Sequence, residues 1–151
     1  MSKRILLIVI AVFALALSLL LVSCGKKTAL TAAEFTELVE KAEYSLAGEA
    51  TRFNDGVTAS IEAISADGAF AVEFYVFSST DKAHDTSAEI DNKLKSLGGT
   101  GVLHSTNIYY RGTNSGTFHF ASRVDNTLIY VETEAKNRDA ASKILKTLGY
   151  W

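Results

Sequence analysis

The chain has 151 residues, 48% of them hydrophobic, with a formal charge of −2, one cysteine and no proline. This length suits one ordinary domain. The near-neutral charge lacks the basic excess that nucleic-acid binding requires, and a single cysteine excludes an internal disulfide. Of the first 23 residues, 18 are hydrophobic. The rest has the composition of a soluble globular domain and is long enough to fold without a metal or a disulfide.

The amino terminus has the pattern of a secretory signal. Lys3 and Arg4 precede an apolar run over residues 5–22 that only Ser18 interrupts. A charged segment followed by an apolar segment is typical of a signal peptide. The same 18 residues also nearly reach the length of a membrane-spanning helix. An uncleaved membrane anchor with an incidental cysteine is therefore the alternative.

The end of the apolar run favours the signal peptide. It reads Leu21-Val22-Ser23-Cys24 and contains the sole cysteine. This resembles the lipobox of bacterial lipoprotein signal peptides, in which small residues precede a cysteine that becomes the lipidated first residue. The resemblance covers residues 1–24. It implies a signal peptide over residues 1–23, acylation of Cys24 by chains such as palmitate, and anchoring on the extracytoplasmic face of the bacterial cell membrane. Each buried methylene of such a chain adds about 0.8 kcal/mol of membrane affinity.

Residues 24–30 then form the lipidated cysteine and a short tether, and we expect a single domain over residues 31–151. Residues 25–30, fully extended, reach about 20 Å, which keeps the domain close to the membrane. Beyond residue 23 the chain has 13 Lys and Arg against 17 Asp and Glu. Electrostatic attraction to an anionic membrane is therefore not expected for the domain as a whole. Lys26 and Lys27 are the exception, because they lie beside the anchor.

In chain order, the domain is predicted to begin with a helix and a hairpin. Thr31-Ala32-Ala33-Glu34 matches a capping box, and apolar residues at helical spacing follow until about Gly48. Alternating apolar residues then predict strands over 57–63 and 70–76, joined at the turn signal Asp67-Gly68. A second helix starts at Ser79 or Thr80, or at a second capping box over 86–89, and ends at Gly98-Gly99.

Three more strands and a last helix complete the prediction. The strands cover 102–110, 116–124 and 127–133, with turn residues at 112–115 and 125–126. Asn137 is expected to cap a final helix whose apolar side continues to Leu148. The order helix, two strands, helix, three strands, helix predicts the α+β class: a two-layer sandwich with about five antiparallel strands and all three helices on one face.

Catalytic and metal-binding patterns are weak in this chain. His104 and His119 could face each other across a hairpin, but no short-spaced cluster supplies further zinc ligands. Ser122, Asp125 and His119 are the residue types of a hydrolase triad without a nucleophile elbow around the serine. The glycines at 98, 99 and 101 lack the lysine and the spacing of a nucleotide loop. We therefore expect no metal, no cofactor and no catalytic residue.

The sheet face turned away from the helices is the predicted recognition surface. Because side chains alternate along a strand, several polar and aromatic residues are expected to point outward together. They are Glu73, Tyr75, His119, Arg123, Tyr130 and Glu132. Tyrosine and arginine are enriched at recognition surfaces, although the same residues also stabilise an ordinary solvated sheet through cross-strand pairs.

The sequence thus favours a lipid-anchored, non-enzymatic lipoprotein of the cell envelope that binds a protein, a peptide or a small ligand, and no nucleic acid. One alternative is a small surface hydrolase that uses His119 with Ser122, Glu73 or Glu132. The other is a structural or assembly lipoprotein without its own ligand.

Overall fold

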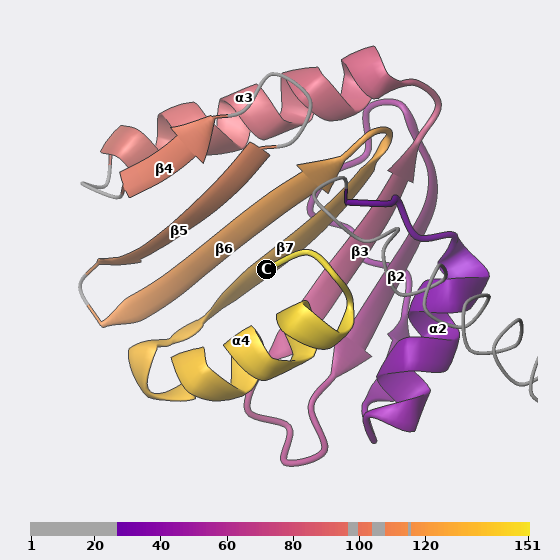
Figure 1. The fold of residues 1–151 in the computed structure, drawn as a ribbon, viewed down its shortest axis with the longest axis vertical. Helices are drawn as coiled ribbons and strands as arrows, with labels where there is room; N and C mark the ends of the chain where they lie inside the picture. The colour runs from indigo at the N-terminus through magenta and orange to yellow at the C-terminus, as the bar shows by residue number, and fades with distance from the viewer. Residues whose placement is uncertain (1–26, 97–99, 104–107, 115) are drawn as a thin grey trace, which may run out of the picture.

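The computed structural model describes residues 27–96, 100–103, 108–114 and 116–151. They form one antiparallel sheet and three α-helices, which confirms the predicted α+β class (Figure 1). The strands lie in the order β1-β2-β3-β7-β6-β5-β4. The elements are α2 (Ala32–Lys41), β1 (Ser45–Gly48), β2 (Val57–Ile64), β3 (Ala71–Phe77), α3 (Thr80–Ser96), β4 (Thr100–Leu103), β5 (Ile108–Asn114), β6 (Thr117–Val124), β7 (Thr127–Glu134), a 3-10 turn (Ala135–Asn137) and α4 (Arg138–Thr147).

The helices lie on both faces of the sheet, so the prediction that all three share one face was wrong. In β3, Phe74 belongs to the apolar core under α2 and α4, whereas its neighbour Tyr75 packs in a second cluster with Ile90 and Leu94 of α3. Figure 1 shows α2 and α4 in front of the sheet and α3 behind its upper end. The domain therefore has three layers instead of two.

The first helix starts where predicted and ends earlier. Thr31 and Glu34 form the capping box, with the backbone N–H of Glu34 donating to Thr31 Oγ1 at 3.2 Å and that of Thr31 donating to the Glu34 carboxylate at 2.8 Å. The helix ends at Lys41, because Glu43 has a φ of +66° that no α-helix continues. Residues 45–48 instead form the edge strand β1, which pairs with β2, and this is one of the two strands beyond the predicted five.

The hairpin turns are mostly as predicted. Gly68, with a φ of +69°, turns β2 into β3, and Asp125, with a φ of +50°, turns β6 into β7. The predicted strand 102–110 is divided between β4 and β5, and the predicted turn at 112–115 is wrong because residues 112–114 still pair with β6. The predicted helix end at Gly98-Gly99 and the histidine at position 104 lie outside the described residues.

Asn137 precedes the last helix without capping it. Its side-chain Nδ2 donates to Thr133 Oγ1 at 2.9 Å, and no side-chain cap bond is present. The Asn137 side chain therefore links the 3-10 turn to β7 and does not cap the start of α4.

Residues before the predicted boundary at Thr31 already contact the domain, from Lys27 onward in the part of the chain that the structure describes. Lys27 Nζ donates to the Tyr150 carbonyl oxygen at 2.8 Å, and the Leu30 N–H donates to the Tyr150 hydroxyl at 3.3 Å. Ala29 and Leu30 pack against the core under α2 and α4. The amino-terminal end of the described chain is therefore fastened to its carboxyl-terminal end.

Candidate functional site

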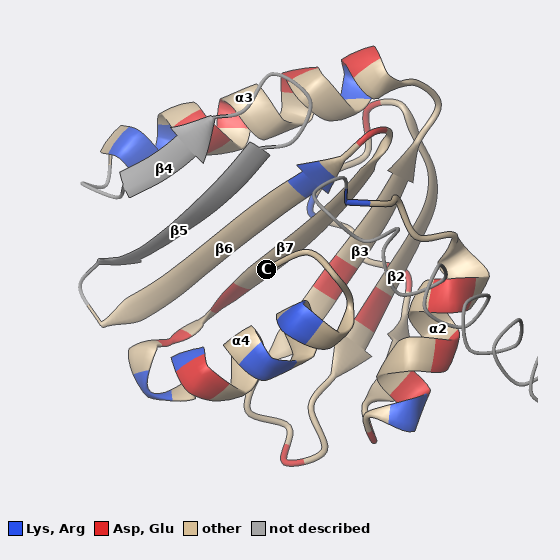
Figure 2. Cartoon of the chain, in the orientation of Figure 1, with Lys and Arg blue, Asp and Glu red and all other residues tan. Residues whose placement is uncertain are grey.

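The six residues of the predicted recognition surface do share one sheet face. They lie on β3, β6 and β7, where Glu73 is the cross-strand partner of Tyr130, and His119 that of Glu132. Acidic positions occur on the adjoining strands β7, β3 and β2 (Figure 2). The two-residue period of the strands was therefore sufficient to group these side chains.

That face is not open, which corrects the expectation of exposure. Tyr75 is 0% exposed, Arg123 1%, Tyr130 3% and His119 8%. The cover consists of α3 and of the segment 49–56 that connects β1 to β2, from which Ala50 and Phe53 pack against the same cluster. Of the six residues, only Glu132 is exposed, and Glu73 keeps a partly exposed side chain.

The side chain of Arg52 joins this face to the 49–56 segment. Its Nε lies 3.1 Å from Glu73 Oε1 and its Nη1 3.2 Å from Glu132 Oε2, while the guanidinium carbon lies 4.5 Å from the centre of the Tyr130 ring. Burial by itself would lower the pKa of Arg52, but the Glu73 carboxylate and the other anionic neighbours raise it. Arg52, Glu73, Tyr75, His119, Tyr130 and Glu132 are called the polar cluster below.

Both tyrosine hydroxyls of the polar cluster are used internally. Tyr75 donates to Glu73 Oε2 at 2.5 Å and accepts from the Arg52 backbone N–H at 3.2 Å, and Tyr130 donates to Glu132 Oε2 at 2.9 Å. Burial and these carboxylate partners raise the pKa of both tyrosines. At neutral pH the two hydroxyls therefore stay protonated and stabilise the fold as hydrogen-bond donors.

His119 lies at the edge of the polar cluster without a hydrogen bond to it. Its Nδ1 is 3.9 Å from Glu132 Oε2, and this buried atom has no hydrogen-bond partner. Burial lowers the pKa of His119; Glu132 opposes this effect, while Lys93 and Arg52 add to it. The neutral ring is thus the favoured form in the folded protein.

Arg123 shares the face but not the polar cluster. Its Nη1 donates to the Asp125 carbonyl oxygen at 3.2 Å, its Nε has no partner, and burial lowers its pKa. Arg123 therefore stabilises the β6–β7 turn and does not form a common site with the other five predicted residues.

The hydrolase triad is not assembled. His119 and Ser122 are three positions apart on β6, so their side chains project from opposite faces of the sheet. His119 lies on the face of Ala121 and Tyr130, and Ser122 lies on the face of Phe120. Within the described part of the chain, no three His, Cys, Asp or Glu side chains are grouped so that they could hold a metal ion.

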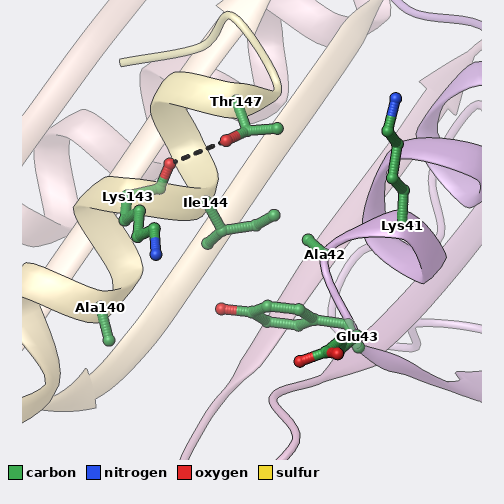
Figure 3. A pocket seen from close by; sticks show the side chains of 8 residues that line it. Lys41, Ala42, Glu43, Ala140, Lys143, Ile144 and Thr147 are labelled. Atoms are coloured by element: carbon green, nitrogen blue, oxygen red, sulfur yellow. Dashed lines mark hydrogen bonds between the residues drawn. The ribbon is translucent and has the colours of Figure 1, made fainter.

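A groove on the other face was missed by the sequence analysis. It lies between the end of α2 and the side of α4 that faces it, has a volume of about 370 Å³, and is shown in Figure 3. Its lining residues are Lys41, Ala42, Glu43, Tyr44, Ala140, Lys143, Ile144 and Thr147. This volume lies within the range of small-ligand sites.

The groove combines apolar walls with two cationic side chains. Ile144 of α4 and Ala42 after α2 point toward one another across it, and Lys41 and Lys143 belong to its two sides (Figure 3). Tyr44 contacts Phe70 edge to face at 5.9 Å, and burial together with the charge of Asp67 raises its pKa to about 12. No sequence period reveals such a groove, since its two walls are nearly one hundred residues apart in the chain.

Comparisons with known proteins support the fold and no function. No protein-family model and no curated protein matches the chain. A crystal structure of a GTP binding regulator from Thermotoga maritima is similar, with a TM-score of 0.50, over 80% of this chain and 88% of that chain at 12% identity. Such a low identity shows a common fold alone. None of the described helices is long and apolar enough to cross a membrane.

Proposed function

We propose that this protein is a lipid-anchored bacterial lipoprotein whose α+β domain is a non-enzymatic binding module of the cell envelope. The observation that carries the proposal is the position of the sole cysteine, Cys24, at the end of an 18-residue apolar segment and after small residues. The folded part begins close to this cysteine, since Ala29 and Leu30 already pack on the core. The protein is then anchored by acyl chains on Cys24 at the extracytoplasmic face of the membrane.

The intact mass of the protein extracted from bacterial membranes tests the anchor. We expect a chain that begins at Cys24 and carries the added mass of acyl chains. The matched variant Cys24→Ser should keep residues 1–23 and lack the acyl mass, because it loses the only thiol that can be lipidated. A membrane-extracted wild type that retains residues 1–23 with an unmodified Cys24 contradicts the proposal and favours the uncleaved anchor.

The groove between α2 and α4 is the better candidate for the binding surface than the polar cluster. In the polar cluster, Arg52 already occupies the two carboxylates, and Tyr75 and Tyr130 are buried. The groove has apolar walls and two lysines against one glutamate, Glu43, so it suits a ligand with an apolar body and an anionic group.

Anilinonaphthalene sulfonate, an aromatic anion that fluoresces in apolar surroundings, is a suitable probe of the groove. We expect saturable binding by the wild type and about tenfold weaker binding by the double variant Ala140→Phe/Lys41→Gln, since the phenyl ring fills the groove and the glutamine removes a charge. The control Ala69→Phe/Lys82→Gln changes the same residue types away from the groove. Equal affinity of all three proteins would contradict a binding site in the groove and would favour a structural or assembly lipoprotein.

GTP serves as a competitor in the same titration, because the structural neighbour is described as a GTP binding regulator. Displacement of the probe by GTP would assign the groove to nucleotides, whose phosphates match its two lysines. Displacement by an apolar carboxylate alone would assign it to small amphipathic anions.

A further inference from the structure

The carboxyl terminus of the chain lies where the lipid tether enters the domain. Lys27 donates to the Tyr150 carbonyl oxygen at 2.8 Å, and Leu30 donates to the Tyr150 hydroxyl. Tyr150 is 0% exposed, and its hydroxyl also shares a hydrogen bond with Thr127. The position of residues 27–30 is therefore fixed relative to the last residues of the chain.

The length of the tether sets how far this end can be from the bilayer. Cys24 and Lys27 are three residue steps apart, and three steps reach at most about 11 Å. The headgroup region is about 5–7 Å thick on each side of the bilayer. With acyl chains on Cys24, the end of the domain that carries Tyr150 must therefore lie at or near the headgroups.

The surface around this point carries groups that suit a lipid interface. Trp151 is partly exposed and stacks on Phe120 with ring centres 5.6 Å apart, and Lys146 Nζ lies 5.6 Å from the centre of the Trp151 ring. Lys143 is exposed on the same helix, α4. Tryptophan and lysine are the side chains that anchor proteins at the membrane–water interface.

The neighbouring helix α2 has the opposite charge. Glu34, Glu37 and Glu40 are exposed on it, and Figure 2 shows more acidic than basic positions on α2 and several basic positions on α4. An anionic membrane therefore attracts α4 and repels α2. The short tether alone allows several tilts of the domain, and this charge difference selects among them.

We propose that the surface formed by Lys27, Lys143, Lys146 and Trp151 rests on anionic lipid headgroups and fixes the orientation of the domain on the membrane. This orientation rests on the proposed acylation of Cys24. It turns α4 toward the bilayer and leaves α3, on the opposite face of the sheet, directed away from it.

Trp151 tests the orientation directly, since it is the only tryptophan in the chain. The full lipid-anchored protein is purified from membranes and reconstituted in phosphatidylcholine vesicles, with or without phosphatidylglycerol, that contain lipids brominated on the acyl chains. We expect bromine to quench Trp151 fluorescence, and to quench it about twofold more strongly when phosphatidylglycerol is present.

Two double variants of equal charge change compare α4 with α3, on the opposite face of the sheet. Lys143→Gln/Lys146→Gln should abolish the phosphatidylglycerol-dependent part of the quenching. Lys82→Gln/Lys93→Gln, on α3, should retain it. In Trp151→Phe/Lys93→Trp, which moves the reporter to α3, the tryptophan should remain unquenched in both kinds of vesicle.

Flotation of the vesicles distinguishes the two proposals. Protein that floats with the vesicles while Trp151 stays unquenched, or is quenched equally with and without phosphatidylglycerol, overturns the orientation and leaves the anchor intact. Equal effects of the α3 and α4 variants also overturn it. Protein that does not float shows that no anchor is present and overturns both proposals.

Discussion

The two faces of the sheet are buried by different means. The face under α2 and α4 is covered by a continuous apolar core that includes Phe35, Phe74 and Phe120. The face under α3 is covered by one helix and by the 49–56 segment, and much of its burial involves Tyr75 and Tyr130, whose hydroxyls are bonded to carboxylates. The first face is filled mainly by apolar side chains, with the Ser122 hydroxyl and the hydrogen-bonded hydroxyls of Thr127 and Tyr150 among them. The second buries two tyrosines whose hydroxyls are paired with carboxylates.

This difference shows that a sheet face rich in the residue types of recognition surfaces can still be buried inside the protein. A buried hydroxyl or guanidinium costs free energy unless it is hydrogen-bonded. Glu73 and Glu132 supply those bonds at the margin of the face, where solvent still reaches part of each carboxylate. Composition alone does not distinguish this arrangement from an open binding face.

The largest expected effect is in the apolar face. Phe74→Ala removes a ring that is 0% exposed and stacked on Phe35 with centres 4.6 Å apart. We expect the free energy of unfolding to fall by about 3–5 kcal/mol, because the substitution removes transfer energy and leaves a cavity. Urea denaturation followed by circular dichroism measures this loss.

Tyr75→Phe is the matched variant on the other face, at the adjacent position of β3. It keeps the ring and removes only the hydroxyl, which donates to Glu73 and accepts from the Arg52 backbone N–H, so we expect a loss of about 1–2 kcal/mol. A Tyr75→Phe variant as unstable as Phe74→Ala would show that the hydrogen bonds, and not apolar burial, dominate the face under α3.

The next effect concerns the attachment of the 49–56 segment. Arg52→Ala removes two ion pairs and the contact with the Tyr130 ring. Because the Arg52 side chain is 37% exposed, solvent screens these contacts, and we expect a loss of about 1–2 kcal/mol that becomes smaller at high salt. Amide hydrogen exchange should accelerate in residues 49–56 before it does in α2.

Lys136→Ala is the control for a single exposed ion pair away from this segment, that between Lys136 and Glu134 at 2.8 Å. It should cost less than about 1 kcal/mol. If both variants lose the same stability and exchange in residues 49–56 is unchanged in Arg52→Ala, the polar cluster does not hold this segment on the sheet.

Local signals in the sequence predicted most of the elements. The capping box at Thr31 and Glu34 and the turns at Gly68 and Asp125 depend on neighbouring residues only, and the structure contains all three. The division of residues 102–110 into two strands has no such signal. The early end of α2 was missed because Leu46 continued the helical spacing, whereas pairing with β2 places it in an edge strand, where it is 44% exposed.

The candidate sites required information that no period in the sequence contains. Strand alternation grouped Glu73, Tyr130 and His119 correctly, but their burial depends on the face that α3 covers, and this is set by tertiary packing. Arg52 lies in a connecting segment without periodicity, so its ion pairs were not foreseen. The resemblance to a lipobox at Cys24 rests on a different kind of signal, since signal motifs are linear and need no fold to be recognised; it lies outside the described residues and stays a prediction.

The smallest expected effect is a pH dependence of stability from His119. Burial lowers the pKa of its ring in the folded protein below the usual value of about 6.5. When the pH falls below that value, the unfolded chain binds a proton that the folded chain resists, so the free energy of unfolding decreases. This loss begins near the pKa of the ring in the unfolded chain and ends once the pH is below its pKa in the folded protein.

His119→Gln lacks the titrating ring, so between about pH 7 and pH 5 its stability should fall less than that of the wild type. Parallel curves for the two proteins would show that the ring is as accessible to protons as in the unfolded chain, and the face under α3 would then be open at His119, as the sequence alone suggested.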